Sequence, residues 1–138
     1  MAHQLLKQRT MIGALFNDPT YLGTIKMLDA TVMRHEAIAS NLANLETPNY
    51  KRIDVAPSFA AELQQAISAG NGAQITEMRP TLTVDTSASA ANRDGNTVQL
   101  ETELLNLNRN TMDHALETKL ISDTYDGLRY AITGRMSK

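Results

Sequence analysis

Two long helical patterns, one near each end of the 138-residue chain, set the strongest limit on its fold. The first opens at Asp18 and Pro19, an N-cap followed by proline at the first helical position, and runs to about Leu45. The second begins near Asn96, which can act as an N-cap, and continues to Gly134, placed as a terminating glycine. Apolar residues recur along both at alternating spacings of four and three, which is the coiled-coil period.

These apolar positions form a seam on each helix, along which the two helices would pack. At 1.5 Å per residue the helices would be roughly 40 and 50 Å long, too long for a small middle region to cover. The sequence therefore predicts a mostly α fold in which the N- and C-terminal helices pair as an elongated antiparallel coiled-coil-like hairpin. The residues expected to carry the seam are Ile25, Leu28, Val32, Leu42, Leu104, Leu107, Ile121, Tyr125, Leu128 and Ile132.

A second apolar row, formed by Met112, Leu116 and Leu120, lies on a shifted face of the C-terminal helix. A hairpin within one chain buries one face only, so this row would favour assembly with other subunits. Each helix would then become fully ordered when neighbouring chains cover its apolar rows. The alternative is a self-contained helical hairpin.

The chain is expected to divide into an N-terminal arm (1–19), an N-terminal helix with its following turn (20–52), an irregular middle region (53–95) and a C-terminal helix (96–138). Within the middle region, residues 57–69 predict a short amphipathic helix. Residues 74–86 favour one extended segment, which Pro80 would confine to a sheet edge. Residues 86–92 are small and polar with nothing to bury, and are expected to lack order.

Composition narrows the classes of partner. A net charge of −2 offers no basic surface for nucleic acid and no polybasic membrane anchor. The absence of cysteine excludes disulfides and cysteine-ligated zinc. No unbroken apolar segment is long enough for a signal peptide or a membrane span. Such a chain is expected to be cytoplasmic or to leave by a route that cleaves no signal, and its partner is expected to be protein.

The two histidines within the helical patterns are the sharpest candidates for chemistry. Di-iron bundles need a Glu three residues before each inward-facing His, and neither His35 nor His114 has one. No Gly-rich phosphate loop and no Ser or Cys nucleophile motif appears. The sequence therefore predicts no enzyme, with no catalytic, metal-ligating or cofactor-binding residues, and the histidines are expected to hydrogen-bond locally or across an interface.

The most specific motif ends the first helix and reads Ser-Asn-Leu-Ala-Asn-Leu-Glu-Thr-Pro-Asn-Tyr-Lys over residues 40–51. Asn41 and Asn44 share a helix face, and their amides can hydrogen-bond to loops or to neighbouring chains. Pro48 stops the helix, and Asn49, which tolerates positive φ, can turn the chain. The residues expected to form contacts between subunits are Asn41, Ala43, Asn44, Thr47, Pro48, Asn49, Tyr50 and Lys51.

This motif resembles the Asn-(Leu/Ile)-Ala-Asn-x-x-Thr-Pro-Gly-Tyr signature of bacterial flagellar axial proteins, the rod and hook family whose subunits stack into a hollow helical tube. Asn49 stands where the family usually has glycine, and Asn is the next residue most tolerant of left-handed geometry. Residues 94–101 and 128–134 also look like the proximal rod members of this family. The N-terminal arm does not align cleanly with them.

The resemblance implies a structural subunit of the flagellar basal-body proximal rod, polymerising with other rod proteins into the drive shaft and export channel. It implies export through the flagellar type III apparatus without a cleaved signal, and a place in the periplasmic rod. The implied partners are copies of the chain, other proximal rod proteins, the adaptor FliE and the export gate. The alternatives are the sibling proximal rod protein FlgC and a cytoplasmic coiled-coil adaptor or chaperone.

Overall fold

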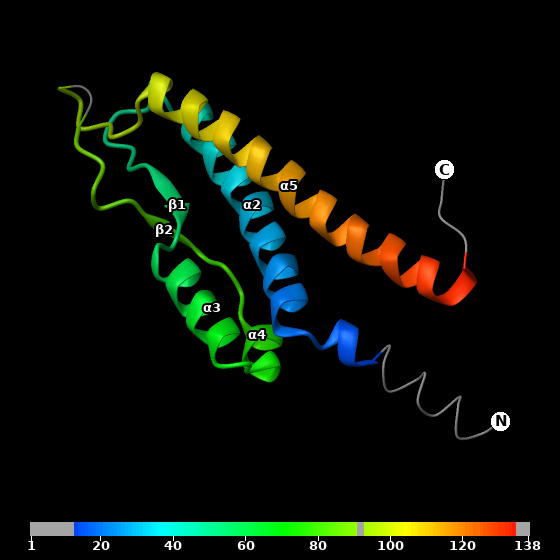
Figure 1. The fold of residues 1–138 in the computed structure, drawn as a ribbon. Coiled ribbons are helices and arrows are strands. Elements are labelled where there is room, and N and C mark those ends of the chain that lie inside the picture. The colour runs from blue at the N-terminus through cyan, green and yellow to red at the C-terminus, as the bar shows by residue number, and fades with distance from the viewer. Residues whose placement is uncertain (1–12, 91–92, 135–138) are drawn as a thin grey trace.

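The computed structural model describes residues 13–90 and 93–134, and most of these residues are helical, as the sequence predicts (Figure 1). Residues 1–12 of the predicted N-terminal arm lie outside this description. A helical turn at residues 13–16 precedes the main elements. These are helix α2 (Pro19–Ala43), strand β1 (Ile53–Val55), helix α3 (Ser58–Ser68), helix α4 (Gly72–Glu77), strand β2 (Leu82–Val84) and helix α5 (Leu100–Thr133).

The predicted start of α2 is confirmed. Oδ1 of Asp18 accepts hydrogen bonds from the N–H groups of Thr20 and Tyr21 at 2.9 and 3.0 Å, and Pro19 occupies the first helical position. These bonds satisfy two of the amides that a helix leaves unpaired at its N-terminus. The helix ends at Ala43, two residues before the predicted Leu45, with Asn44 at the C-cap.

The predicted start of α5 at Asn96 is wrong. The helix begins at Leu100, and residue 99 stands at the N-cap with no side-chain capping bond. Asn96 is used elsewhere, because its Oδ1 accepts from the N–H of Val98 at 2.8 Å while its amide nitrogen reaches back to the end of α2. The predicted end is confirmed, since Gly134 has a φ of 66° and its N–H donates to the carbonyl oxygen of Tyr130 at 2.8 Å.

The middle region is more regular than expected. The predicted short helix is present as α3. Residues 74–77, predicted as extended, belong to α4, because Oδ1 of Asn71 accepts from the N–H of Gln74 at 3.1 Å and Ile75 is fully buried. The remaining part of that segment contains β2, which pairs antiparallel with β1 in the register Ile53↔Val84, Asp54↔Thr83 and Val55↔Leu82. Residues 86–90 contain neither helix nor strand.

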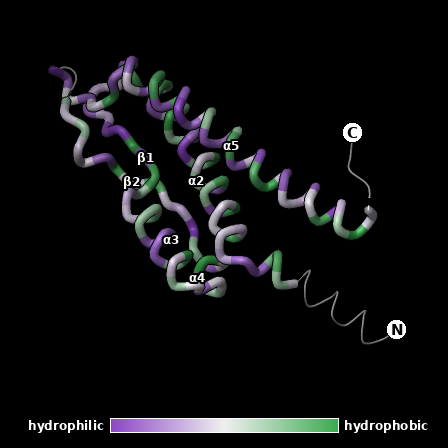
Figure 2. The backbone as a smooth tube through the Cα atoms, viewed as in Figure 1, coloured by the Kyte–Doolittle hydropathy of each residue, from purple (hydrophilic) through white to green (hydrophobic). Residues whose placement is uncertain are grey.

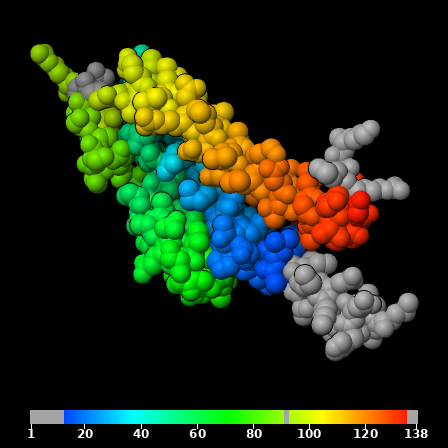
Figure 3. Space-filling model, in the orientation of Figure 1, coloured from blue at the N-terminus to red at the C-terminus, as the bar shows by residue number. Residues whose placement is uncertain are grey.

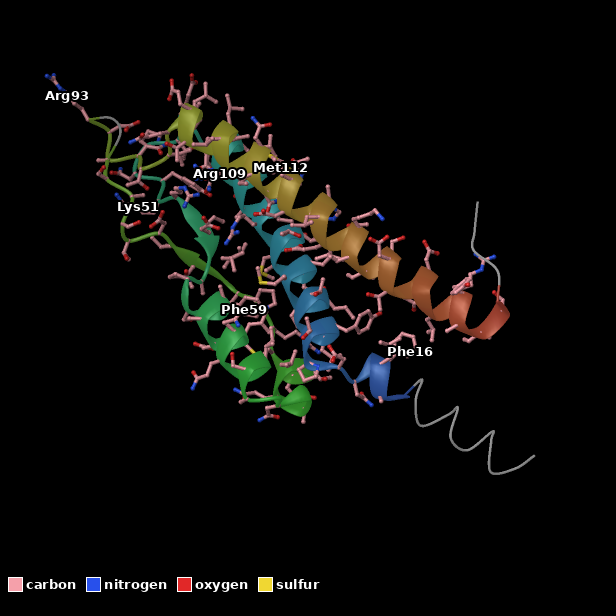
Figure 4. All side chains as sticks on the ribbon, in the orientation of Figure 1. Phe16, Lys51, Phe59, Arg93, Arg109 and Met112 are labelled. Carbon is pink, nitrogen blue, oxygen red and sulfur yellow. The ribbon has the colours of Figure 1, made fainter. Side chains whose placement is uncertain are left out.

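Helix α2 lies between α5 on one side and the small sheet with α3 and α4 on the other (Figure 1). The largest cluster of buried apolar residues lies on the second of these sides, and Figure 4 shows Phe59 between α3 and α2. Gly23 of α2 allows α3 to pack closely against α2, since a Cβ at this position would lie 2.4 Å from Cδ1 of Ile67 in α3. The buried residues of the core are Ala30, Val55, Phe59, Leu63, Ala66 and Ile75.

Polar residues occupy the contact between α2 and α5. Asn41 of α2 meets Glu103 near the start of α5, and Thr31 meets Asn110 and Glu117 farther along, so the two helices run in opposite directions. The buried residues of α5 are Glu103, Asn110 and Glu117, spaced by seven. Burial of an unpaired polar group is costly, and Oδ1 of Asn110 has no hydrogen-bond partner within the described ranges.

The buried heptad positions therefore lie one residue before those that the apolar pattern indicates. Leu104, predicted in the seam, is 47% exposed because Glu103 takes the inward position. Val32, Tyr125 and Ile132, also predicted in the seam, are exposed. The other seam residues are half-buried, namely Ile25, Leu28, Leu42, Leu107, Ile121 and Leu128.

We expect Leu63→Ala to lower the free energy of unfolding by about 2–5 kcal/mol, because Leu63 lies in the core and its loss leaves a cavity. The matched change Leu116→Ala should stay within about 0.5 kcal/mol, because Leu116 is exposed on α5 of the single chain. Urea unfolding followed by circular dichroism measures both. Equal losses for the two variants would contradict the one-sided core.

Candidate functional site

After α2 ends, the motif at residues 41–51 forms a turn that is stabilised by hydrogen bonds among its own polar groups. The amide nitrogen of Asn44 donates to the carbonyl oxygen of Ser40 at 2.9 Å, and Oγ1 of Thr47 donates to Oδ1 of Asn44 at 3.1 Å. Asn49 has a φ of 60°, in the left-handed region that Asn tolerates. Its N–H donates to the carbonyl oxygen of Asp94 at 2.9 Å. The predicted turn is present, and a second loop packs against it.

That second loop, residues 93–97, closes the end of α2. The buried amide nitrogen of Asn96 lies 2.8–3.0 Å from the carbonyl oxygens of residues 44, 45 and 47, at the end of α2 and in the turn that follows it. Nζ of Lys51 donates to the carbonyl oxygen of Gly95 at 2.8 Å. Gly95 has a φ of 77°, and a Cβ there would lie 2.8 Å from Oδ1 of Asn49, so only glycine fits this approach.

Asn41 is fully buried and fixes the position of β1. Its Oδ1 accepts from the N–H of Ile53 at 3.0 Å, and its Nδ2 donates to the carbonyl oxygen of the same residue at 2.9 Å. The side-chain amide thus pairs with the backbone of Ile53 as a neighbouring strand would. Nδ2 also donates to Oε2 of Glu103 at 3.2 Å, and Oδ1 lies 3.4 Å from the hydroxyl of Tyr50.

A buried ion pair completes the junction. Nε of Arg52 donates to Oε1 of Glu103 at 2.6 Å, and the side chains of these two residues are 7% and 0% exposed. Two charges taken out of water need each other and further hydrogen bonds, and removal of one partner leaves the other unpaired. Glu103 therefore receives hydrogen bonds from both Asn41 and Arg52, which belong to the segment 41–52. We call Asn41, Arg52, Asn96 and Glu103 the polar junction.

The other nitrogens of Arg52 reach the small sheet. Nη2 of Arg52 donates to Oδ2 of Asp54 at 3.0 Å, and Nη1 of Arg52 donates to Oδ2 of Asp85 at 2.7 Å. Burial disfavours its charge, yet the hydrogen bonds to Glu103 and Asp54 raise the pKa of Arg52 above its ordinary value. The hydrogen bond from the hydroxyl of Ser87 lowers the pKa of Asp85, against the opposing effect of burial, and Arg52 lowers it further. Both groups are therefore held in their charged forms.

A polar cleft of about 350 Å³ opens beside this network, lined in part by Arg52, Asp54 and Asp85. These charged groups already pair with one another, at distances of 2.7–3.0 Å. Asp54 also accepts from Nε of Arg34 at 3.0 Å. The charges around the cleft are thus committed to holding the sheet on α2 and α5.

The residues predicted to contact other subunits separate into two groups. Asn41 was expected to offer its amide to a neighbour, but it is in the interior, because Ile53 and Glu103 take up its hydrogen bonds. Tyr50 and Asn44 are half-buried, and the hydroxyl of Tyr50 lies 3.1 Å from that of Ser40. The exposed residues among these predicted contacts are Ala43, Thr47, Pro48, Asn49 and Lys51.

The outward side of α5 carries the apolar row that the sequence indicates. Met112 is 72% exposed and Leu116 is 60% exposed, while Leu105 and Leu120 extend the same row. Figure 4 labels Met112 on α5, and Figure 3 shows α5 uncovered along the side of the molecule. Figure 2 shows hydrophobic residues recurring along α5 among hydrophilic ones. The helix thus presents a polar face to α2 and an apolar row to the outside.

Comparison with curated proteins finds relatives named flagellar basal body rod protein FlgB. The relative from Borrelia hermsii is 30% identical over 125 residues, covering 78% of this chain and 90% of the relative. The chain belongs to the FlgB family. The Cereibacter sphaeroides FlgB is 32% identical over 111 residues, covering 73% of this chain and 84% of the relative. The Borreliella burgdorferi FlgB is 27% identical over 113 residues. No family model matches the chain.

In this FlgB-family chain, His35 and His114 line a groove between α2 and α5, together with Thr31 and Asn110. Among residues 13–90 and 93–134, no group of three or more His, Cys, Asp or Glu side chains is placed to hold a metal ion. No helix in the same part of the chain is long and apolar enough to cross a membrane.

Sequence reasoning missed Arg52, Asn96 and Glu103 as members of the polar junction. Charged residues within a helical pattern are normally solvated, so periodicity gave no sign that Glu103 is buried. The resemblance of residues 94–101 to rod proteins draws attention to Asn96, but it includes neither Arg52 nor Glu103.

We expect Asn41→Ala to destabilise the chain, because it leaves the backbone groups of Ile53 without their partners and removes one hydrogen bond from Glu103. Each unsatisfied buried group costs about 1–3 kcal/mol. The matched change Asn44→Ala should cost less, since it removes local bonds at a half-buried position. Thermal and urea unfolding of the purified chains measure this. An Asn41→Ala variant as stable as Asn44→Ala would refute the interior role.

Proposed function

We propose that the chain is a structural subunit of the flagellar basal-body rod, which assembles with copies of itself and with other rod proteins. The observation that carries the proposal is the apolar row on the outward side of α5 in a chain of the FlgB family. Contiguous exposed apolar residues on a soluble domain mark a surface for protein contact. The role is mechanical rather than catalytic.

The position of the row suits a helix with two neighbours. At 100° per residue, Met112 and Leu116 lie on the far side of α5 from Asn110, which faces α2. Contact with α2 therefore leaves the row free for another chain. Covering Met112 and Leu116 would add burial that the single chain lacks.

The motif turn provides the second contact in the proposed assembly. Thr47, Pro48 and Asn49 are exposed, and the polar junction fixes the backbone on both sides of them. A turn held this way needs little further ordering on binding, so less conformational entropy is lost. Lys51 adds an exposed charge beside it. We propose that these groups specify the orientation of one subunit against the next.

We propose that α2 and α5 act together as the coiled-coil-like hairpin of the inner rod, with residues 53–95 as the middle region and residues 1–19 as an arm. The expected partners are other proximal rod proteins, the adaptor FliE and the export gate. Export through the flagellar type III apparatus without a cleaved signal, and residence in the periplasmic rod, complete the proposal.

We expect the double substitution Met112→Gln and Leu116→Gln to abolish swimming in a strain that lacks the native gene, because it makes the proposed contact row polar. The helix content of the purified chain should stay unchanged, since both side chains are exposed. Motility and co-purification of the chain with basal bodies are the measurements. Val84→Gln, an equivalent change at an exposed strand position, serves as the control.

The control should swim normally. Normal swimming of the double variant would contradict a contact role for the row. Loss of helix in the purified double variant would instead show that the row supports the fold of the single chain.

A further inference from the structure

Glu117 is buried at a position where an ionised carboxylate would have few stabilising contacts. It is 8% exposed on the side of α5 that faces α2. None of the ion pairs in the described part of the chain includes it, in contrast to Glu103 with its arginine. Its Oε2 lies 3.1 Å from Oγ1 of Thr31, the one hydrogen-bond partner that it has there.

Thr31 has a single hydroxyl proton and two neighbouring oxygens. Its Oγ1 lies 2.8 Å from the carbonyl oxygen of Leu28 and 3.1 Å from Oε2 of Glu117. A hydroxyl donates one hydrogen bond and accepts others, so it cannot donate to both oxygens. When Glu117 is ionised, one of the two contacts therefore lacks a donor. When Glu117 is protonated, both contacts can be hydrogen bonds.

We propose that Glu117 takes up a proton in the folded chain and acts as a proton-dependent latch between α5 and α2. The protonated carboxyl donates to Oγ1 of Thr31, whose own proton then goes to the carbonyl oxygen of Leu28. Loss of the proton removes one donor from this pair of contacts and leaves a buried charge with no ion-pair partner within the described residues. The latch does not depend on the proposed role in the rod.

The charged groups around Glu117 do not reverse this effect. Burial raises the pKa of Glu117, the hydrogen bond from Thr31 lowers it, and the negative charge of Asp113 on the same helix raises it. His114 on α5 and Arg34 on α2 lower it, but the net direction is upward from the ordinary value of 4.5. The stabilisation by the proton is therefore fully present below pH 4.5 and is lost as the pH rises through the raised pKa.

The latch acts on the C-terminal part of α5, which contains no buried residue after Glu117. Beyond Glu117, the half-buried residues are Ile121, Thr124 and Leu128, and the others through Gly134 are exposed. Phe16, which contacts the rings of Tyr21 and Tyr125, supplies a further attachment. Opening at Glu117 would leave this stretch attached mainly through Tyr125 and the half-buried residues around it. Acid should therefore tighten the helix pair and alkali should loosen it.

Two measurements on the full chain test the latch. Carbon-detected NMR titration of the side-chain carboxyls should show Glu117 titrating above the ordinary value of 4.5. Glu62, an exposed residue of α3, provides the control position for the unfolding measurement. Urea unfolding at mildly acidic and mildly alkaline pH then compares the native chain with Glu117→Gln, whose neutral amide keeps a donor for Thr31. Glu62→Gln is the matched control.

As the pH falls, we expect the urea midpoint of the native chain to rise relative to that of Glu117→Gln. The difference in midpoint between the native chain and Glu62→Gln should show no such rise. A Glu117 titration midpoint at or below 4.5 would overturn the proposal. A difference between the native chain and Glu117→Gln that stays constant with pH would also overturn it.

Discussion

The ion pair between Arg52 and Glu103 is the interaction on which the arrangement of the chain depends. It joins a residue just before β1 to a residue in the first turn of α5, at the place where Asn41 of α2 also binds Glu103. Two segments that are distant in sequence, residues 41–52 and the start of α5, thus meet at one buried carboxylate. Because hydrocarbon side chains would not require this geometry, the pair fixes the register of α5 against α2 as a buried polar residue does in a coiled coil.

The same junction fixes the turn that the motif at residues 41–51 is proposed to present to a neighbouring subunit. Asn41 and Asn96 are committed to the interior, where they bind backbone groups of β1 and of the turn. Their hydrogen bonds hold Pro48 and Asn49 at the surface in a defined conformation. In the proposed assembly, the turn and the apolar row of α5 are two contact surfaces whose relative positions are fixed. Such fixed surfaces favour one orientation between neighbouring subunits.

Local signals in the sequence were sufficient for several elements. Asp18 and Pro19 mark a helix start through backbone chemistry alone, and Gly134 and Asn49 mark positions with positive φ. The amphipathic pattern of α3 likewise predicts its buried face, since Phe59 and Leu63 recur at helical spacing. In each case the deciding interactions lie within a few residues of chain.

The misplaced features depend on contacts between distant residues. The apolar pattern of α5 placed Leu104 inward, but Glu103 is inward because Arg52 and Asn41 supply hydrogen bonds from elsewhere. Asn96 resembled an N-cap, yet it caps the end of a different helix. Periodicity assumes that charged side chains face water, and a fully paired buried carboxylate breaks that assumption.

A double-mutant cycle between Arg52 and Glu103 tests the central role of the junction most directly. The single variants Arg52→Gln and Glu103→Gln and the double variant would each be unfolded in urea. The account predicts that the double variant loses less stability than the sum of the single losses, with a coupling energy of about 0.5–3 kcal/mol. Additive losses would contradict the claim that this ion pair holds α5 to the rest of the chain.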